Sequence, residues 1–327
     1  MDRMKHLERA LDGQNSFWKY LAMTLIVFLG ASTIGSLPLA ITMIINTIKN
    51  GMPDLITGNL TDLSSYGISG NVGFFLLLLT FLPMLFAFKW LLPPFHKRRL
   101  TETINGRHRL RKGRIGMGML VWGLLMSISL IYGLITSPEN YQFQFHAGRF
   151  LLLLLITLSI LPFQTTFEEL FFRGYLSQGV AAATRSRWAT LIIISMAFGL
   201  MHAFNPEVNE FGFWISIPNY ILMGAILGAV SILDDGIELA IGIHFINNAF
   251  IALFTTHHSS VFQTDALFRV KEIDPVAELI WMCLYAVVVI LLLARLYHWN
   301  FAIFNRRITP TPPPLPPAET TPQGEGA

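Results

Sequence analysis

Long apolar runs alternate with short polar segments along most of the chain. A run of about 20 apolar residues is enough to cross a bilayer as an α-helix. The pattern predicts eight membrane helices, at residues 17–48, 72–92, 115–135, 150–167, 189–201, 211–233, 237–254 and 276–296. We therefore expect an all-α fold, that of a polytopic integral membrane protein with about eight transmembrane helices, surrounded by a lipid bilayer.

Two of these segments have an unusual length. Residues 17–48 are longer than one crossing needs, so we expect a tilted helix or a break at the Gly-Ser-Leu-Pro of residues 35–38. Residues 189–201 are only 13 positions long, too few to cross a bilayer alone. We therefore expect His202, which follows this segment, to lie within the thickness of the membrane.

Composition and charge refine this picture. Charged residues make up 13% of the 327 positions, about half of the roughly 25% found in soluble domains. Residues 93–114 alone carry eight Lys and Arg, and short basic loops of this kind are typically cytoplasmic. With that loop inside, the inside segments hold 16 Lys and Arg and the outside loops hold 4. We expect both termini in the cytoplasm, a solvated basic loop, and no nucleic-acid partner.

Two further features carry no chemistry that we can identify. Cys283 is the one cysteine of the sequence, so the chain can form neither an internal disulfide nor a metal site built from cysteines. Residues 308–327 are rich in proline and should be disordered or in polyproline II conformation.

Three ionisable residues stand out at the end of the fourth apolar segment. Such groups cost roughly 2.5–3.5 kcal/mol each at membrane depth, so they are usually functional. Glu169 and Arg173 are four residues apart and should form a pair on one face of a helix. Glu168 lies about 100° round that helix, and no nearby residue is expected to pair with it. One carboxylate is therefore expected to be held in place and the other to be available.

Polar residues interrupt two later apolar segments as well. His202 follows Phe198 by one helical turn, and His244 and Asn248 share one face of the seventh segment. Asn247 lies off that face and is expected to pack or cap. Because burying unpaired polar groups costs a few kcal/mol each, the simplest expectation is that the polar residues of the three segments meet.

The three motifs, EELFFRGYL (168–176), FGLMHA (198–203) and AIGIHFINNAF (240–250), resemble those of a known family. It is the CAAX protease and bacteriocin-processing family of intramembrane endopeptidases, which includes the Ras-converting CAAX endoprotease. The resemblance covers about residues 150–255. It implies six catalytic-site residues: Glu168, Glu169, Arg173, His202, His244 and Asn248.

The chemistry of these side chains fits that resemblance. Peptide hydrolysis needs an activated water and donors for the developing oxyanion. Glu168 suits the general base and His202 suits a group that shares the water, while His244 and Asn248 suit the oxyanion. Glu168, His202 and His244 could also hold one divalent metal such as zinc, although no HExxH motif is present. A metal-free mechanism would use the same side chains, and the sequence leaves both open.

The resulting expectation is an intramembrane endopeptidase of the CAAX-processing or bacteriocin maturation or immunity type. Its substrate would be a membrane-associated or short peptide, and its location the plasma (inner) membrane of a bacterium. We expect N-terminal membrane helices and the basic loop in residues 1–149, the protease core in 150–255, the last loop and membrane helix in 256–307, and the tail in 308–327. Two alternatives are a proton- or ion-coupled transporter, which would place more charges on the other segments, and a non-catalytic membrane scaffold, which would have lost one of the polar residues.

Overall fold

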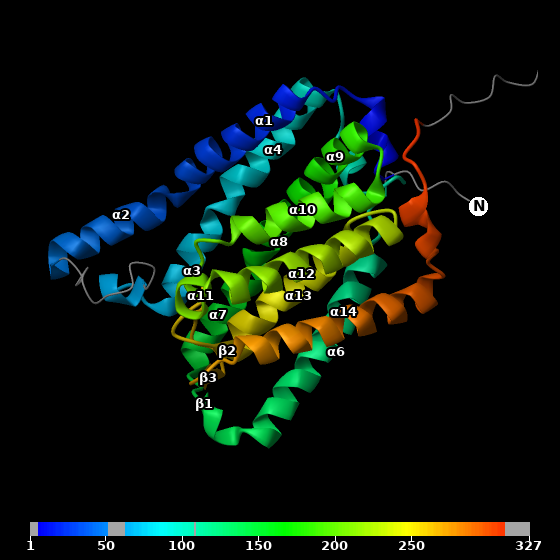
Figure 1. Ribbon diagram of the computed structural model, residues 1–327. Helices are drawn as coiled ribbons and strands as arrows, with labels where there is room; N and C mark the ends of the chain where they lie inside the picture. Colours follow the sequence, from blue (N-terminus) through cyan, green and yellow to red (C-terminus); the bar gives the residue numbers. More distant parts are fainter. Residues whose placement is uncertain (1–5, 52–62, 108, 311–327) are drawn as a thin grey trace, which may run out of the picture.

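A computed structural model describes residues 6–51, 63–107 and 109–310, most of which lie in helices (Figure 1). The all-α prediction is confirmed. The α-helices are α1 (Phe17–Leu25), α2 (Ser32–Asn50), α3 (Gly70–Leu79), α4 (Phe81–His96), α5 (Thr101–Ile104), α6 (Lys112–Thr136), α7 (Ala147–Ser159), α8 (Leu161–Glu169), α9 (Ser177–Thr184), α10 (Arg187–Met201), α11 (Pro206–Phe211), α12 (Phe213–Leu233), α13 (Glu238–Phe254) and α14 (Pro275–Tyr297). Two π-helical turns are η2 (Ile26–Ala31) and η5 (Leu170–Leu176), and the 3-10 helices are η1 (Glu8–Asp12), η3 (Leu63–Tyr66), η4 (Pro138–Asn140) and η6 (Phe301–Asn305). The prediction for the proline-rich tail concerns mainly residues outside the described ranges.

All eight predicted apolar segments are helical, but they fall into two classes. Among the described residues, six helical segments are long and apolar enough to cross a membrane: Phe17–Asn50, Gly70–His96, Lys112–Thr136, Ala147–Thr184, Phe213–Leu233 and Pro275–Tyr297. The other two are the shorter helices α10 and α13. His202 follows directly after α10, and His244 and Asn248 lie on α13.

The first long helix is irregular, but not where the sequence suggested. Helix α2 continues through Pro38, and the irregularity is the π-helical turn η2, one to two turns earlier. Gly35 instead serves close packing, because a Cβ there would lie 2.5 Å from the carbonyl oxygen of Thr80. Thr80 is the residue between α3 and α4, so the glycine lets α2 lie directly on that junction.

Three short strands add a small sheet that the sequence did not predict. They are β1 (Tyr141–Phe143), β2 (Thr255–Thr256) and β3 (Phe268–Val270), in the order β1-β3-β2. β3 pairs antiparallel with β1 and parallel with β2. Runs of two or three residues are too short to show a period of two, so a sequence pattern does not reveal them.

The short helices α10 and α13 each cross a neighbouring helix at a glycine, where the two backbones approach closely. Helix α13 packs on α6, where a Cβ on Gly242 would lie 2.1 Å from the Ile115 carbonyl oxygen and one on Gly118 would lie 2.4 Å from that of Leu239. Helix α10 crosses α12 in the same manner at Gly199. Small residues allow this close approach of helices in membranes. The glycines therefore set the depth and rotation of both helices.

The basic loop is tied into the fold rather than wholly solvated as predicted. Arg98 is buried, and its guanidinium donates to Gln178 and to the hydroxyl of Tyr20. Arg111 forms an ion pair with Glu238 (2.5 Å), the fully buried first residue of α13. The pair of Arg111 with Glu238 anchors one end of the helix that carries His244.

Candidate active site

The polar residues of the first motif lie on the irregular helix formed by α8 and η5. Glu168, Glu169 and Arg173 are 8%, 0% and 1% exposed, so all three are removed from solvent and lipid. The chain changes from α- to π-helical directly after Glu169. Such π-helical turns often occur at functional sites, where they re-aim side chains.

Glu169 holds two partners with one oxygen. Its Oε1 accepts a hydrogen bond from Nη1 of Arg173 at 2.8 Å and another from Nδ1 of His244 at 2.7 Å. The predicted ion pair of Glu169 with Arg173 is therefore confirmed. Arg173 also donates to the carbonyl of Gly224 on α12 and lies 4.0 Å from the ring centroid of Phe198 on α10. The pair thus connects η5 to α10, α12 and α13.

Glu168 is bound on one oxygen only. Its Oε1 accepts a hydrogen bond of 2.6 Å from the side-chain amide of Gln164, one helical turn earlier. The expectation that Glu168 has no local partner is wrong. Its Oε2 accepts no hydrogen bond from the part of the chain that the structure describes, and lies 3.6 Å from Nε2 of His244. This oxygen is the one available for chemistry.

The protonation of His244 follows from its partner. An ionised carboxylate can only accept, so Nδ1 of His244 carries the proton that it donates to Glu169. In the neutral ring Nε2 is then an acceptor, and it faces Oε2 of Glu168. Two acceptors therefore face each other across 3.6 Å, too far and of the wrong kind for a direct hydrogen bond.

His202 lies at the end of α10 beside the same aromatic ring as His244. The centroid of the Phe198 ring is 4.7 Å from that of His202 and 6.0 Å from that of His244. Nδ1 of His202 donates to the carbonyl of Phe198 at 2.7 Å, which leaves Nε2 as an acceptor in the neutral ring. Its ring stacks on Tyr220 at 4.4 Å, and Asn205 donates to the Tyr220 hydroxyl. The His202 ring is therefore fixed on both sides.

Asn248 and His244 face α8 together, as their spacing predicted. Asn248 donates through Nδ2 to Oε1 of Gln164 at 3.2 Å. Its neighbour Asn247 donates to Oδ1 of Asn248 at 3.1 Å and accepts a hydrogen bond of 3.0 Å from the indole of Trp122 on α6. Asn247 therefore does more than pack or cap the helix.

The residues suggested as metal ligands do not assemble as ligands. Within residues 6–51, 63–107 and 109–310, no three His, Cys, Asp or Glu side chains lie close enough together to hold a metal ion. Glu168, His202 and His244 therefore do not fit a zinc site in this arrangement. The Nδ1 atoms of both imidazoles bind protein acceptors, so Nε2 is the ring nitrogen of each that could bind a further partner.

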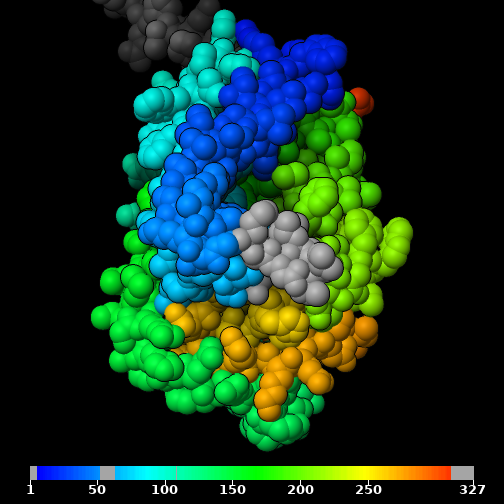
Figure 2. Space-filling view, turned by 90° about the vertical axis from the view of Figure 1, so that its left-hand side faces the viewer, coloured from blue at the N-terminus to red at the C-terminus, as the bar shows by residue number. Residues whose placement is uncertain are grey.

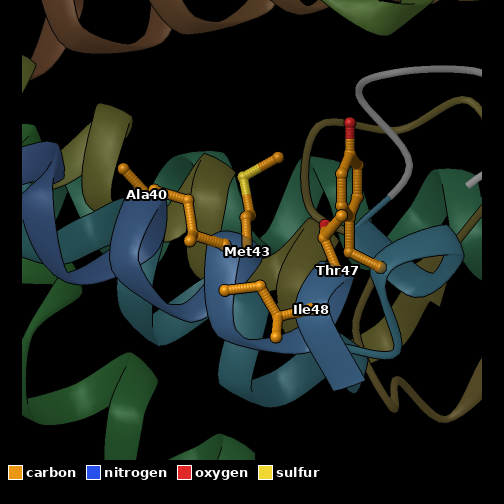
Figure 3. A pocket seen from close by; sticks show the side chains of 6 residues that line it. Ala40, Met43, Thr47 and Ile48 are labelled. Carbon is orange, nitrogen blue, oxygen red and sulfur yellow. The ribbon is translucent and has the colours of Figure 1, made fainter. Parts of the chain in front are cut away.

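The site has two neighbouring features on the molecular surface. Figure 2 shows a hollow between the blue helices α1 and α2 and the yellow-green segment around α10 and α11, with green atoms of the middle of the chain at its bottom. A separate apolar pocket lies against α2 (Figure 3). Its lining residues are Ala40, Met43, Ile44, Thr47, Ile48 and Tyr66, none of which belongs to the polar site.

Sequence reasoning missed three residues of this site. Gln164 could have been found, because it lies four residues before Glu168 and is a polar residue in an apolar segment. Tyr220 and Trp122 could not, because aromatic residues in membrane helices are common and neither belongs to a motif. Their partners, Asn205 and Asn247, are reached only through the packing of different helices.

Comparisons of the sequence with known proteins identify a family. The sequence model of the family described as Type II CAAX prenyl endopeptidase Rce1-like matches residues 148–250, which contain all six predicted site residues. The chain is also similar to Uncharacterized protein YyaK of Bacillus subtilis (strain 168), with 30% identity over 302 residues, which is 90% of this chain and 96% of the relative. No solved structure matches the chain.

Proposed function

This chain belongs to the Rce1-like family of type II CAAX prenyl endopeptidases, and we propose that it hydrolyses a peptide bond within the membrane by means of a water molecule activated by Glu168. The observation that carries this proposal is the 3.6 Å separation of Oε2 of Glu168 from Nε2 of His244, two atoms that are both acceptors when the imidazole is neutral. A water molecule has two O–H donors and can bind one to each. It would then be oriented with a lone pair directed away from both groups, as a nucleophile requires.

The proposed proton path uses residues already held in place. Glu168 accepts a proton from the water as it attacks the carbonyl carbon, and later gives it to the leaving amine. His202 offers Nε2 as a further acceptor, which can receive a hydrogen of the water only in place of Nε2 of His244. His244 keeps its orientation through Glu169, and this arrangement resembles the carboxylate–imidazole pairs of other hydrolases.

Asn248 is the proposed donor to the oxyanion. One of its two amide hydrogens is used on Gln164, and the other is available for the oxygen of the scissile carbonyl. An amide can act neither as base nor as nucleophile, so donation is the role its chemistry allows. Such donors strengthen as charge develops in the transition state.

The proposed substrate is a short peptide or protein segment at the membrane. The description of the matched family names a prenyl endopeptidase, and CAAX sequences carry their lipid on the cysteine. We therefore propose peptides that end in Cys-aliphatic-aliphatic-X as the first probes, each prepared with and without an S-farnesyl group. Peptides of bacteriocin-precursor type form the second set. The proposed location is the bacterial plasma (inner) membrane, with both termini cytoplasmic.

The test is Glu168→Gln in purified protein in lipid nanodiscs, assayed with internally quenched peptides of both sets. The amide keeps the size of the side chain and its acceptor toward Gln164, but it cannot take a proton from water. We expect cleavage to fall below a few per cent of wild type while the thermal melt stays close to it. Turnover near the wild-type rate in this variant would show that Glu168 is not the base.

A further inference from the structure

A chain of hydrogen bonds runs from α6 through α13 to Glu168. The indole of Trp122 donates to Asn247 (3.0 Å), Asn247 to Asn248 (3.1 Å), Asn248 to Gln164 (3.2 Å), and Gln164 to Oε1 of Glu168 (2.6 Å). Trp122 is fully buried, and Gln164 and Glu168 are nearly so. Side-chain hydrogen bonds alone thus connect the three helices α6, α13 and α8.

The chemistry of the two ends gives this chain a single direction. An indole nitrogen can only donate, and an ionised carboxylate can only accept. Each of the three amides between them must therefore accept on the side of Trp122 and donate on the side of Glu168. If any one of them turned over, two donors or two acceptors would face each other, which is most disfavoured at the buried Gln164 and less so at the half-buried Asn247 and Asn248.

We propose that Trp122, Asn247, Asn248 and Gln164 act as a positioning chain that holds the Gln164 amide as a donor to Oε1 of Glu168. With Oε1 occupied, the carboxylate is oriented so that Oε2 alone faces His244. The inference rests on the proposed function of Glu168; it adds Trp122, Asn247 and Gln164 as residues that act through Glu168, and gives Asn248 a second role. Trp122 is the distant end, and it belongs to α6 rather than to any helix of the three motifs.

The surrounding packing supports a positioning role. Trp122 is fully buried and packs in a T-shaped contact with Tyr285 of α14, with ring centroids 5.4 Å apart, which restricts rotation of its indole. Gly118, one helical turn before Trp122, lies in the close crossing of α6 with α13. Asn247 and Asn248 are adjacent and point about 100° apart, one toward α6 and one toward α8. The two asparagines therefore connect the hydrogen bond on the α6 side of α13 to the one on its α8 side.

The experiment measures kcat and KM of purified protein in nanodiscs, with the quenched peptide that wild type cleaves best. The variants are Gln164→Met, Asn247→Leu and Trp122→Phe, with the double variants that combine Gln164→Met with each of the other two. We expect each single variant to lower kcat roughly 10–100-fold with KM little changed, because small displacements of a catalytic group cost about that much. Each double variant should be no slower than Gln164→Met alone, because the others act through Gln164.

A matched control removes the same kind of bond elsewhere. The indole of Trp188 donates to Asn305 at 2.9 Å, at a site that shares no residue with the chain. Trp188→Phe should leave kcat unchanged. Losses in kcat that add in the double variants and follow the melting temperatures would show a purely structural role, and would overturn the proposal.

A spectroscopic measurement separates this proposal from the proposed function. Deuterated protein labelled with ¹⁵N-tryptophan gives up to seven indole N–H signals, one for each tryptophan, and Trp122→Phe identifies the one that belongs to Trp122. We expect Asn247→Leu and Gln164→Met to shift that signal and Trp188→Phe to leave it in place.

If Glu168→Gln abolishes cleavage while the Gln164, Asn247 and Trp122 variants keep wild-type kcat, the positioning chain is wrong and the function stands. If Glu168→Gln remains active, the function is wrong whatever the signal does.

Discussion

Replacing Glu169 with glutamine tests the difference between the two adjacent carboxylates. The substitution keeps the shape of the side chain and removes its charge. In the structure one oxygen of Glu169 binds both Arg173 (2.8 Å) and His244 (2.7 Å), and the three side chains are almost completely buried. Glu169→Gln therefore leaves a buried guanidinium without its counter-charge.

The expected cost follows from that burial. Breaking a buried ion pair by removing one partner typically costs about 3–5 kcal/mol. Arg173 retains the Gly224 carbonyl and the face of the Phe198 ring, so we expect the lower end of this range. At about 2.1 cal/mol/K of unfolding entropy per residue, the 327 residues give roughly 0.7 kcal/mol/K, so a loss of about 3 kcal/mol corresponds to a fall of roughly 4 °C in Tm. Cleavage should also fall, because His244 loses the partner that orients it.

The assay is thermal unfolding in nanodiscs, followed by intrinsic tryptophan fluorescence, with two controls. Glu168→Gln changes the neighbouring residue in the same way and should melt close to wild type. Arg149→Ala breaks a pair that is 3.6 Å long and whose arginine is largely exposed, so it should cost less than about 1 kcal/mol. The double variant Glu169→Gln with Arg173→Met, which removes both charges, should recover much of the lost stability. A Glu169→Gln protein that melts like wild type would refute the argument.

Three further predictions concern metal dependence, topology and pH. Because the proposed metal ligands do not assemble, we expect activity to survive dialysis against a strong chelator, and restoration of a lost activity by zinc would contradict this. A cysteine placed at the exposed Arg107 in a Cys283→Ser background should react with a membrane-impermeant maleimide only after the cells are opened; labelling of intact cells would reverse the topology. Burial lowers the pKa of His6 in the folded protein, despite the nearby carboxylate of Asp235. Below about pH 6.5 the unfolded chain therefore binds more protons at this residue than the folded protein does, and the free energy of unfolding should fall as the pH drops. In the His6→Gln variant, Tm should fall less between pH 7 and pH 5 than in wild type. Equal changes of Tm with pH in the two proteins would contradict this prediction.

Much of the fold could be predicted because the membrane imposes strong rules on the sequence. Apolar runs located all eight helical segments, and their lengths separated α10 from the spanning helices. The pair of Glu169 with Arg173 followed from a spacing of four residues on one helix. The irregular turn η2 did not follow, because π-helical turns have no clear sequence pattern. Of the two alternatives, a tilt or a break at residues 35–38, the break relied on a rule for proline that has exceptions in membranes.

The partners of the site were harder to predict than its residues. Motif spacing named Glu168, His244 and Asn248, but it could not show that His244 would bind Glu169 or that Asn248 would bind Gln164. Those contacts depend on the rotation of α13 against α8, which is set by its glycine crossing with α6. The division of the chain into residues 1–149 and 150–255 remains a prediction. Trp122 and Arg111 nevertheless show that residues before 150 contact the helix of His244.

The different environments of Glu168 and Glu169 are the physical basis for their different proposed roles. Both are buried glutamates on one helix, and about 100° of rotation separates them. Glu169 points at an arginine and an imidazole N–H, and both donate to the same oxygen. Glu168 points at one neutral amide and, like Glu169, keeps one oxygen without a donor among the described residues. A group that must gain and lose a proton in each turnover needs that second kind of environment, because each donor removed lowers the cost of protonation. Exchanging the two environments, for example by placing a cation beside Glu168, should therefore stop turnover even though every motif residue is retained.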